Sequence, residues 1–572
     1  MDRTKETHMS GDAGGMTAPL VPLTIGVIGH RDLHSDAVAA ITSSIRDVLV
    51  SYRDRFPLTP ILLLSSLAQG ADQLAVEACQ GLESVRLIGI LPLAVDDYEL
   101  DFPESGDLDE FRRCLASCES VVLADDLTAS MSRVLSDPAP TAESARDMAY
   151  QRCARFISDQ SHVLIAVWDG EPPEFPGGTS DTIHYRLAST ERLTDDGRAS
   201  LWPAEPGVLI HIPAARPARG SGTPGRGLAM AGTSRPRLID EDFQQEQWNE
   251  TIQDPHADRI EFLNLRSLAG GLPRGPLSVT QSIMNLADAE ASIHQVQYRR
   301  RAASVVLAGI CTLVLIHFEQ SFAQRWLIGP ALIAVTATGV LWFCLTRTNA
   351  KDKFQQSRAL AEGARVQSAW LAAGVRSCPS DYYLEGQPDT AWIRRTMRSA
   401  WLADRIGSQA IQSPWSAANE WTQGQLDYFE GSSDRAGAIA RNRIKARKYR
   451  LLTRAGVVLA LLGMAIDALR FITGDGSATA TSDLGQVAWE VGLATAAASV
   501  AYGHLLAFDE IDRQYTFAAA TYRRGLSDLS RLRGHDPTPY QIQAIVELVG
   551  LAALHETASW LALNRDRSVR PL

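Results

Sequence analysis

The stretches Ala302–Phe318 (AASVVLAGICTLVLIHF) and Trp326–Leu345 (WLIGPALIAVTATGVLWFCL) contain no Asp, Glu, Lys or Arg. A helix needs roughly 17–25 mostly apolar residues to cross a bilayer, so both stretches are long enough. The segment 319–325 between them is polar and long enough only for a tight turn. We therefore expect a transmembrane hairpin, although two helices buried inside a soluble helical domain would give the same pattern.

A second, less apolar pair follows at Ala455–Thr473 and Val487–Phe508. The polar or charged residues that interrupt it are Asp467, Arg470, Glu490 and His504. Such residues inside membrane spans face a bundle interior or water, so Asp467, Glu490 and His504 are candidates for an intramembrane polar path or pore. The alternative is that Glu490 lies at the outer interface and Asp467 pairs with Arg470.

The charges beside the spans predict their orientation. The basic residues are Arg299, Arg300 and Arg301 before the first span, Arg347, Lys351 and Lys353 after the second, Arg441, Arg443, Lys445, Arg447, Lys448, Arg450 and Arg454 before the third, and Arg513, Arg523 and Arg524 after the fourth. The loop Gly474–Gln486 has no Lys or Arg. Because short loops rich in Lys and Arg stay in the cytoplasm, we expect four spans with both termini and all soluble segments cytoplasmic.

Composition excludes several classes of protein. The net charge of −11 argues against a protein that binds duplex nucleic acid, which would carry a basic surface. The seven cysteines are scattered without a CxxC pair, which is typical of reduced cytosolic thiols and predicts no metal site. Residues 1–20 are polar and Gly-rich, so we expect no cleaved secretory signal and insertion from an internal span.

The N-terminal part alternates apolar strands with helices. The predicted strands are Leu23–Ile28, Ile61–Leu64, Val85–Leu91, Ser120–Leu123 and Val163–Val167, with a return strand near Gly207–Ile212. Helices are expected at Ser35–Ser51, Gln73–Gln80 and Ala142–Ser158. Continuous apolar strands joined by helices predict an α/β fold with a parallel sheet covered on both faces.

Three Gly-containing loops follow these strands, where the carboxyl ends of parallel strands form binding crevices. The candidate ligand-binding residues are Gly26, Gly29, His30, Arg31, Ser65, Gly70, Ala71, Asp72, Gly177, Gly178 and Thr179. Glycines allow backbone N–H groups to approach a phosphate, and Arg31 can contact it with two N–H groups. Asp72 could accept hydrogen bonds from a ribose or cap the helix it begins. Turn chemistry alone is the alternative reading of these loops.

The blocks GVIGHRDL, SSLAQGADQLAVEAC, LPLAVDDYELDF, SHVLIAVWDG and PGGTSD, in this order, resemble the SLOG superfamily. That Rossmann-like group contains the DNA-processing protein A and the Lonely Guy nucleotide phosphoribohydrolases. The resemblance covers roughly residues 21–190 and implies that a nucleotide or nucleotide-derived ligand binds across the three loops. Lonely Guy enzymes carry a PGGxGTxxE stretch, whereas this chain has PGGTSDTIHYR. The missing glutamate, with Asp181 as the nearest acid, favours sensing over hydrolysis.

The second half resembles the SLATT type of two-transmembrane effector. The match rests on RALAEGARVQ, DYYL, WIRR and ETASWLALNRDR and implies a membrane-disrupting or ion-conducting role in bacterial conflict signalling. The predicted segments are a tail at 1–20, a SLOG-like domain at 21–215, a flexible insert at 216–258, and two helical membrane modules at 259–400 and 401–572. Glu556, Trp560 and Asn564 share one face of the last helix and predict a packing seam.

We therefore expect a multi-pass protein of the bacterial inner membrane that senses a nucleotide-like ligand and couples it to a transmembrane effector. One chain is too small for a pore, so the expected partners are the lipid bilayer, the ligand and further copies of the chain. No other cofactor is expected. A membrane-anchored nucleotide hydrolase that uses His30, Arg31, Asp72 and Asp181, and a scaffold without activity, are the alternatives.

Overall fold

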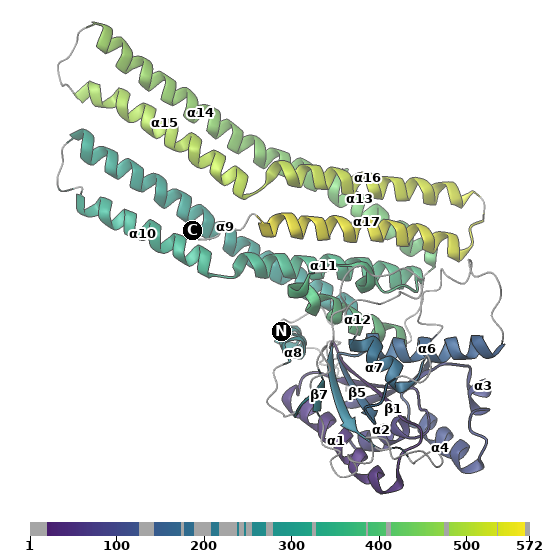
Figure 1. Cartoon of the computed structure of the whole chain (residues 1–572). Coiled ribbons are helices and arrows are strands. Elements are labelled where there is room, and N and C mark those ends of the chain that lie inside the picture. The colour runs from purple at the N-terminus through teal and green to yellow at the C-terminus, as the bar shows by residue number, and fades with distance from the viewer. Residues whose placement is uncertain are drawn as a thin grey trace, which may run out of the picture. The chain divides into compact units, whose positions relative to one another are not determined.

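A computed structural model describes residues 20–124, 142–172, 177–187, 207–214, 216, 237–239, 245–247, 254–269, 278–322, 326, 328–384, 387–407, 413–473, 480–534 and 536–566 (Figure 1). The chain divides into two compact units. Unit 1 comprises Met1–Leu286 and Arg376–Gln409, and unit 2 comprises Ala287–Val375 and Ala410–Leu572. The two units interleave along the chain, because residues 376–409 belong to unit 1.

Unit 1 is built on a mixed sheet with the strand order β4-β3-β2-β1-β5-β6-β7-β8. The strands are β1 (Leu23–Gly29), β2 (Ile61–Ser65), β3 (Val85–Leu91), β4 (Ser120–Leu123), β5 (Val163–Trp168), β6 (Val208–Pro213), β7 (Arg237–Ile239) and β8 (Gln245–Gln247). The first six are parallel, and β7 and β8 pair antiparallel. The order reverses between β1 and β5, as in Rossmann-like folds.

The helices and 3-10 turns of unit 1 lie between these strands along the chain or follow the last of them. They are the 3-10 turn Ser35–Ala37, α1 (Val38–Arg55), α2 (Ala71–Cys79), α3 (Val95–Glu99), α4 (Ser105–Ala116), α6 (Ala142–Gln160), α7 (Thr179–Leu187), α8 (Pro255–Ala269), the 3-10 turns Pro379–Tyr382 and Pro388–Thr390, and α12 (Ala391–Ile406). The predicted α/β class and the expected parallel strands are confirmed, because apolar runs such as ILLL in β2 are buried on both faces.

Two glycines of β1 show how closely helices approach both faces of the sheet. A Cβ at Gly26 would lie 2.2 Å from Ser161 Oγ, just after α6, and one at Gly29 would lie 2.3 Å from Ala71 Cβ of α2. Residues 26 and 29 point to opposite faces because strand side chains alternate. The sheet is therefore covered on both sides, by α6 on one and α2 on the other.

The short strands β7 and β8 come from the stretch 216–258, for which no fold of its own was expected. Both have three residues, and β8 (QEQ) has no apolar residue, so neither carries the alternating or continuous apolar pattern by which strands are predicted. They join the sheet through β6, where Ile210 pairs with Leu238.

Unit 2 is helical. Its elements are α9 (Val279–Phe322, which begins in unit 1), α10 (Ile328–Arg347), α11 (Ala350–Ala373), α13 (Pro414–Glu430), the strand pair β9 (Gly431–Ser432) and β10 (Arg435–Ala436), α14 (Ala438–Thr473), α15 (Ala480–Leu505), α16 (Phe508–Arg533) and α17 (Pro539–Asp566). Helices α11, α13, α16 and α17 pack together as a bundle. A Cβ at Gly550 of α17 would lie 2.1 Å from the indole nitrogen of Trp370 in α11, so these two helices require a glycine where they meet.

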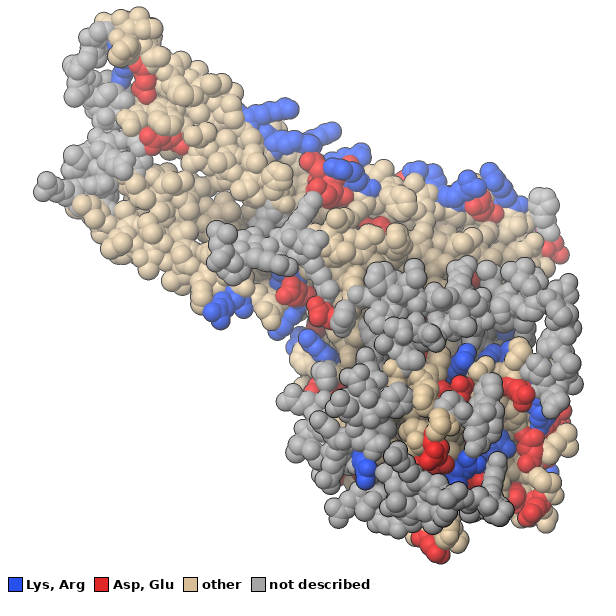
Figure 2. All heavy atoms as spheres, viewed as in Figure 1, with Lys and Arg blue, Asp and Glu red and all other residues tan. Residues whose placement is uncertain are grey.

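Four stretches are long and apolar enough to cross a membrane: Ile328–Ala373, Ala438–Thr473, Gly485–Arg533 and Pro539–Leu563. The first contains all but the first two residues of the second span expected from sequence, and the next two contain the third and fourth expected spans. In the apolar windows of α10 and α14, only 6% and 17% of the residues are buried. Figure 2 shows the middle of these hairpins as a surface with few charges, with most of their Lys and Arg at the end nearer the bundle and a few charged side chains near the connecting loops. These features indicate a membrane protein.

The first span expected from sequence is not among these four stretches, and the fourth stretch was not expected to be a span. The expected span 302–318 lies in α9, but its side chains are described only as far as Ile316. The stretch Pro539–Leu563 belongs to α17, which packs against α11, α13 and α16 and buries Val546, Leu554 and Leu561. We therefore assign α17 to the bundle, since a helix that buries its apolar face against other helices does not require lipid.

Helices α14 and α15 form an antiparallel hairpin in which glycines face each other. A Cβ at Gly492 would lie 2.5 Å from the backbone nitrogen of Ala460 and 2.5 Å from the carbonyl oxygen of Gly456. Gly463 is as close to Trp489 and Gly485. Small residues allow helix backbones to approach closely within membranes, so this contact holds the second hairpin together.

Substitution of Gly492 by valine should therefore separate α14 from α15. The new side chain would meet backbone atoms, which cannot move aside, and overpacking of this kind costs about 1–3 kcal/mol. We expect the unfolding temperature of the detergent-purified protein to fall by roughly 5 °C. The control is Gly503→Val in the same helix, where a Cβ would have no atom within 4 Å. Equal unfolding temperatures for both variants would contradict the close hairpin contact.

Candidate functional site

The candidate site of unit 1 lies at the carboxyl ends of β1 and β5, where the strand order reverses. Open α/β sheets bind ligands in the crevice at this switch point, because the loops of neighbouring strands diverge there. His30 follows β1, and Asp169 follows β5. The register pairs Gly29 with Val167, which brings the two residues to the same edge.

His30 and Asp169 form a pair at this edge. The Nε2 atom of His30 lies 3.0 Å from Oδ1 of Asp169, and both side chains are 10% exposed. The backbone N–H of Asp169 also lies 3.2 Å from the same ring nitrogen. An Nε2 atom that carries hydrogen donates to the carboxylate, and one without hydrogen accepts from the amide, so the position of the ring hydrogen decides which of the two partners Nε2 binds. Burial raises the pKa of Asp169, but the hydrogen bond and charge of His30 outweigh it and leave this pKa below its ordinary value.

Two arginines lie close to the pair. Arg216 donates to both oxygens of Asp32, at 3.1 and 3.2 Å, and one of its nitrogens is 4.0 Å from Asp169. Arg31 is exposed, and its guanidinium carbon lies 5.6 Å from the centre of the Tyr150 ring. In the described part of the chain no carboxylate pairs with Arg31. The Tyr150 ring therefore orients the Arg31 guanidinium, and its N–H groups can donate hydrogen bonds to an anionic ligand.

The predicted residues Ser65 and Asp72 form an internal clamp. Oδ1 of Asp72 accepts hydrogen bonds from the hydroxyl of Ser65 at 2.8 Å and from the backbone N–H of Ser66 at 2.9 Å. Asp72 is only 4% exposed. Burial raises the pKa of Asp72 to about 6, although these hydrogen bonds and Arg31 lower it. Asp72 therefore fixes the turn between β2 and α2 and does not reach outward to a ribose.

Gly70 explains how the first two loops fit together. Its φ is +82°, and a Cβ there would lie 2.4 Å from the carbonyl oxygen of Arg31 and 2.5 Å from that of His30. The N–H of Ala71 donates to the His30 carbonyl at 3.2 Å. Glycine at position 70 thus allows the loop after β2 to pack directly against the loop after β1.

The third loop lies at the beginning of α7. The N–H of Gly177, which has a φ of +77°, donates to Oδ2 of Asp181 at 2.9 Å, and Gly178 accepts from the backbone N–H of Thr182. Thr179 is the first residue of α7. The amino termini of α2 and α7 both lie at the carboxyl edge of the sheet, and a helix amino terminus attracts anions.

The candidate ligand residues are thus gathered by the ends of β1, β2 and β5. The order of residues in the sequence shows that each loop follows a strand. The contacts that bring the three loops together become visible only in the fold. Gly26 is the exception, because it lies inside β1 against α6. His162 precedes β5 at the opposite edge of the sheet. It is buried against Thr24, and burial lowers its pKa well below the ordinary value.

The three polar residues expected in the membrane spans lie at different places along the second hairpin. Asp467 of α14 lies against Gly485, and Glu490 of α15 accepts from Gln486 at 3.4 Å, both in the half of the hairpin near its connecting loop. His504 lies 14 residues after Glu490, which is about 21 Å along a helix. Within the described residues no ion pair joins Asp467 to Arg470.

Sequence reasoning missed Asp32, Tyr150, Asp169 and Arg216 as members of the site. Asp169 could have been found, since it follows a buried strand at the edge where His30 lies. Arg216 could not, because it stands 184 residues from Asp32 in a stretch without periodic pattern. No group of three or more His, Cys, Asp or Glu in the described ranges is placed to hold a metal ion.

Comparisons of the chain with protein-family models, with curated proteins and with solved structures found no match. The interpretation of the site therefore depends on its geometry.

The raised pKa of Asp72 predicts a pH-dependent stability. The folded protein keeps Asp72 protonated up to about pH 6, whereas an unfolded aspartate has a pKa of 3.8. Raising the pH from 3.5 to 7 therefore lowers the free energy of unfolding, by about 3 kcal/mol from this group. Asp72→Asn removes this penalty and keeps an acceptor oxygen.

We expect the unfolding temperature of Asp72→Asn, relative to the wild type, to rise between pH 4 and pH 7. The control Asp109→Asn removes an exposed carboxylate of α4 and should show no such rise. A difference that stays constant with pH would mean that Asp72 is ionised in the folded protein throughout this range.

Proposed function

We propose that this chain is a membrane-anchored sensor: its α/β domain binds a nucleotide or nucleotide-derived ligand, and its hairpins form the effector. The observation that carries the proposal is the β1/β5 switch point, where Arg31, the His30–Asp169 pair and the amino termini of α2 and α7 are gathered. Phosphate groups are recognised by such a combination of guanidinium and helix amino termini.

A continuous helix connects the ligand-binding unit to the hairpins. Helix α9 begins at Val279 in unit 1 and continues into unit 2 without a break as far as Phe322. Its first turn is capped by the buried Asp404, which accepts from the N–H of Val279 at 2.8 Å and from that of Thr280 at 2.9 Å. A carboxylate that accepts from these N–H groups stabilises the start of the helix, so movements of unit 1 are passed to α9 through its backbone.

Binding shifts the effector only if the ligand has different affinities for two states of the protein. In this proposal several chains assemble, and the hairpins conduct ions or disrupt the membrane when the ligand is bound. The basic residues beside the spans and the absence of Lys and Arg from Gly474–Gln486 support a cytoplasmic location of both termini. The motif blocks quoted above support an assignment to SLOG-type sensing with SLATT-type effectors in bacterial conflict signalling.

The His30–Asp169 pair favours one second candidate, a membrane-anchored nucleotide hydrolase. A histidine held by a carboxylate is a common general base, and 3.0 Å is within hydrogen-bond reach. Asp72 and Asp181 fit this role less well, because both accept hydrogen bonds within their own loops. Turnover of the bound nucleotide separates the two candidates.

Replacing Arg31 by alanine tests the site. The full-length protein in detergent is titrated with a panel of mono-, di-, tri- and cyclic nucleotides, and saturable thermal stabilisation identifies a ligand. We expect Arg31→Ala to lower the binding affinity for that ligand by roughly tenfold or more, since a charge-assisted hydrogen bond contributes about 1.5–3 kcal/mol. The control Arg86→Ala removes an arginine at the opposite, amino-terminal end of β3, where it pairs with Glu119.

Stabilisation without turnover supports the sensor, and turnover that is lost in His30→Ala supports the hydrolase. Equal affinities in the Arg31 and Arg86 variants would place the ligand elsewhere. Thermal stability that no nucleotide changes would favour a scaffold without ligand binding.

A further inference from the structure

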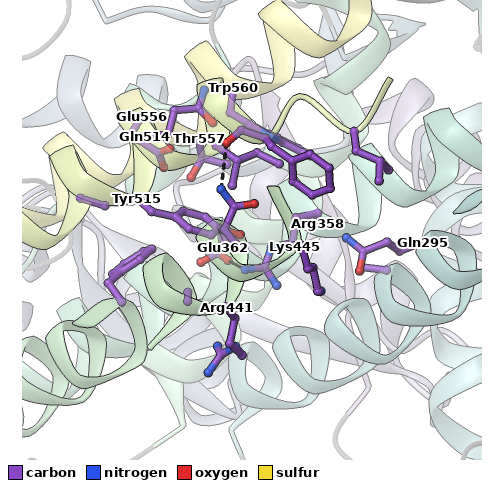
Figure 3. A pocket seen from close by; sticks show the side chains of 18 of the residues that line it. Gln295, Arg358, Glu362, Arg441, Lys445, Gln514, Tyr515, Glu556, Thr557 and Trp560 are labelled. Atoms are coloured by element: carbon purple, nitrogen blue, oxygen red, sulfur yellow. Dashed lines mark hydrogen bonds and ion pairs between the residues drawn. The ribbon is translucent and has the colours of Figure 1, made fainter. Parts of the chain in front are cut away.

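Unit 2 contains a large cavity between the feet of the two hairpins, with a volume of about 1470 Å³. Its walls come from every helix that enters or leaves a hairpin. Arg299 contributes from α9, Lys351 from the start of α11, Lys445 from α14, and Tyr502 from the end of α15. Figure 3 shows Lys445 and Arg441 facing it, with Glu556 and Trp560 of α17 on another side. The cavity therefore lies at the depth where the chain passes from the bundle to the spans.

One end of the cavity is lined by cations that lack a counter-charge. Arg299, Arg441, Lys445 and Lys448 line it, and none of them forms an ion pair with a carboxylate in the part of the chain that the structure describes. Burial lowers the pKa of Lys445, and the charges of Arg299 and Arg441 lower it further. Cations from both hairpins thus repel one another across this space, and a bound anion would relieve the repulsion.

Two arginines that line another part of the cavity, Arg358 and Arg365, are paired with carboxylates. Arg358 pairs with Asp288 at 2.9 Å and with Glu362, and Arg365 also pairs with Glu362. Burial alone would raise the pKa of Glu362, but these two arginines hold it below its ordinary value. On α14 itself, Arg443 does not line the cavity and pairs with Asp512 at 2.7 Å. Three cations of α14 that form no ion pair with a carboxylate among the described residues, Arg441, Lys445 and Lys448, therefore face the cavity.

Aromatic and apolar side chains continue from this cationic end. The ring of Tyr449 lies 5.2 Å from that of Tyr502 and is stacked on Phe508 at 5.5 Å. Leu452, one turn further toward the span, also lines the cavity. Tyrosines of this kind gather at the level of lipid headgroups, where one end of the ring is wet and the other apolar.

We propose that this cavity binds an anionic phospholipid of the cytoplasmic leaflet. Its phosphate lies against Lys445, Lys448 and Arg299, and its acyl chains follow Leu452 toward the spans. Basic pockets between membrane helices on the cytoplasmic side are known to hold anionic headgroups, and sites for small molecules typically measure about 300–1000 Å³. The lipid contacts both hairpins, so its occupancy stabilises their association. This inference does not depend on the nucleotide site.

The test measures thermal stabilisation of the full-length protein, purified in delipidating detergent, by phosphatidylglycerol added in mixed micelles. Phosphatidylcholine serves as the zwitterionic comparison, and glycerol phosphate and inorganic phosphate as soluble anions. The variant Lys445→Gln/Lys448→Gln removes two cavity cations. Its matched control, Arg447→Gln/Arg454→Gln, removes two charges from the same stretch of α14 that are exposed and do not line the cavity.

We expect phosphatidylglycerol to stabilise the wild type, with the half-saturating lipid fraction raised about thirtyfold in the cavity variant and less than threefold in the control. The variant Lys445→Arg/Lys448→Arg, which keeps the charges, should bind within about threefold of the wild type. If the double glutamine variant does not fold, Lys445→Gln alone should weaken binding about fivefold. Equal loss in cavity and control variants, equal stabilisation by phosphatidylcholine, or saturation by the soluble anions at the same concentration would overturn the proposal.

Discussion

Lipid solvation of the hairpin helices is the physical constraint on which the rest of the structure depends. Phe471 and Ile472 of α14 are 89% and 78% exposed, and Ile333 of α10 is 70% exposed. Burial of one such side chain away from water contributes about 1.5–3 kcal/mol of free energy, and a side chain that faces water gains none of it. Summed over a hairpin, this exceeds the stability of an ordinary domain, so the hairpins are stable only with their faces in a bilayer. The polar unit 1 and the bundle are then attached to a membrane by necessity.

The sheet of unit 1 and the hairpins keep their apolar surfaces away from water in different ways. In the sheet, apolar strands are covered by helices on both faces, and the one edge left for chemistry is where β1 and β5 diverge. In the second hairpin, α14 and α15 approach each other closely along glycines such as Gly456 and Gly492, and most of the apolar side chains of α14 stay exposed for contact with lipid. Helix α9 belongs to both units, so it is a covalent route by which the ligand proposed for His30 and Arg31 would act on the hairpins.

The six parallel strands of the sheet and most of the spans could be predicted from sequence, because burial on both faces or in lipid imposes a continuous apolar pattern. Val85–Leu91 and Ser120–Leu123 match β3 and β4 to the residue. The clamp formed by Ser65 and Asp72 could not, since an aspartate at a helix start looks the same whether it points inward or outward. Pairings such as Arg216 with Asp32, and the cavity between the hairpins, join residues too distant in sequence for any local pattern. The predicted seam of Glu556 and Trp560 proved to line that cavity, where Trp560 also packs against Phe354.

Coupling between the two units is the central claim, and backbone hydrogen exchange of the full-length protein in lipid nanodiscs, with and without a stabilising nucleotide, tests it most directly. Ligand binding should slow exchange at the ends of β1 and β2 and at the start of α7. It should also change exchange where α9 and α14 enter their hairpins, since two states of different ligand affinity must differ there. Slowed exchange confined to the sheet edge, with the hairpin feet unchanged at saturating ligand, would contradict the account.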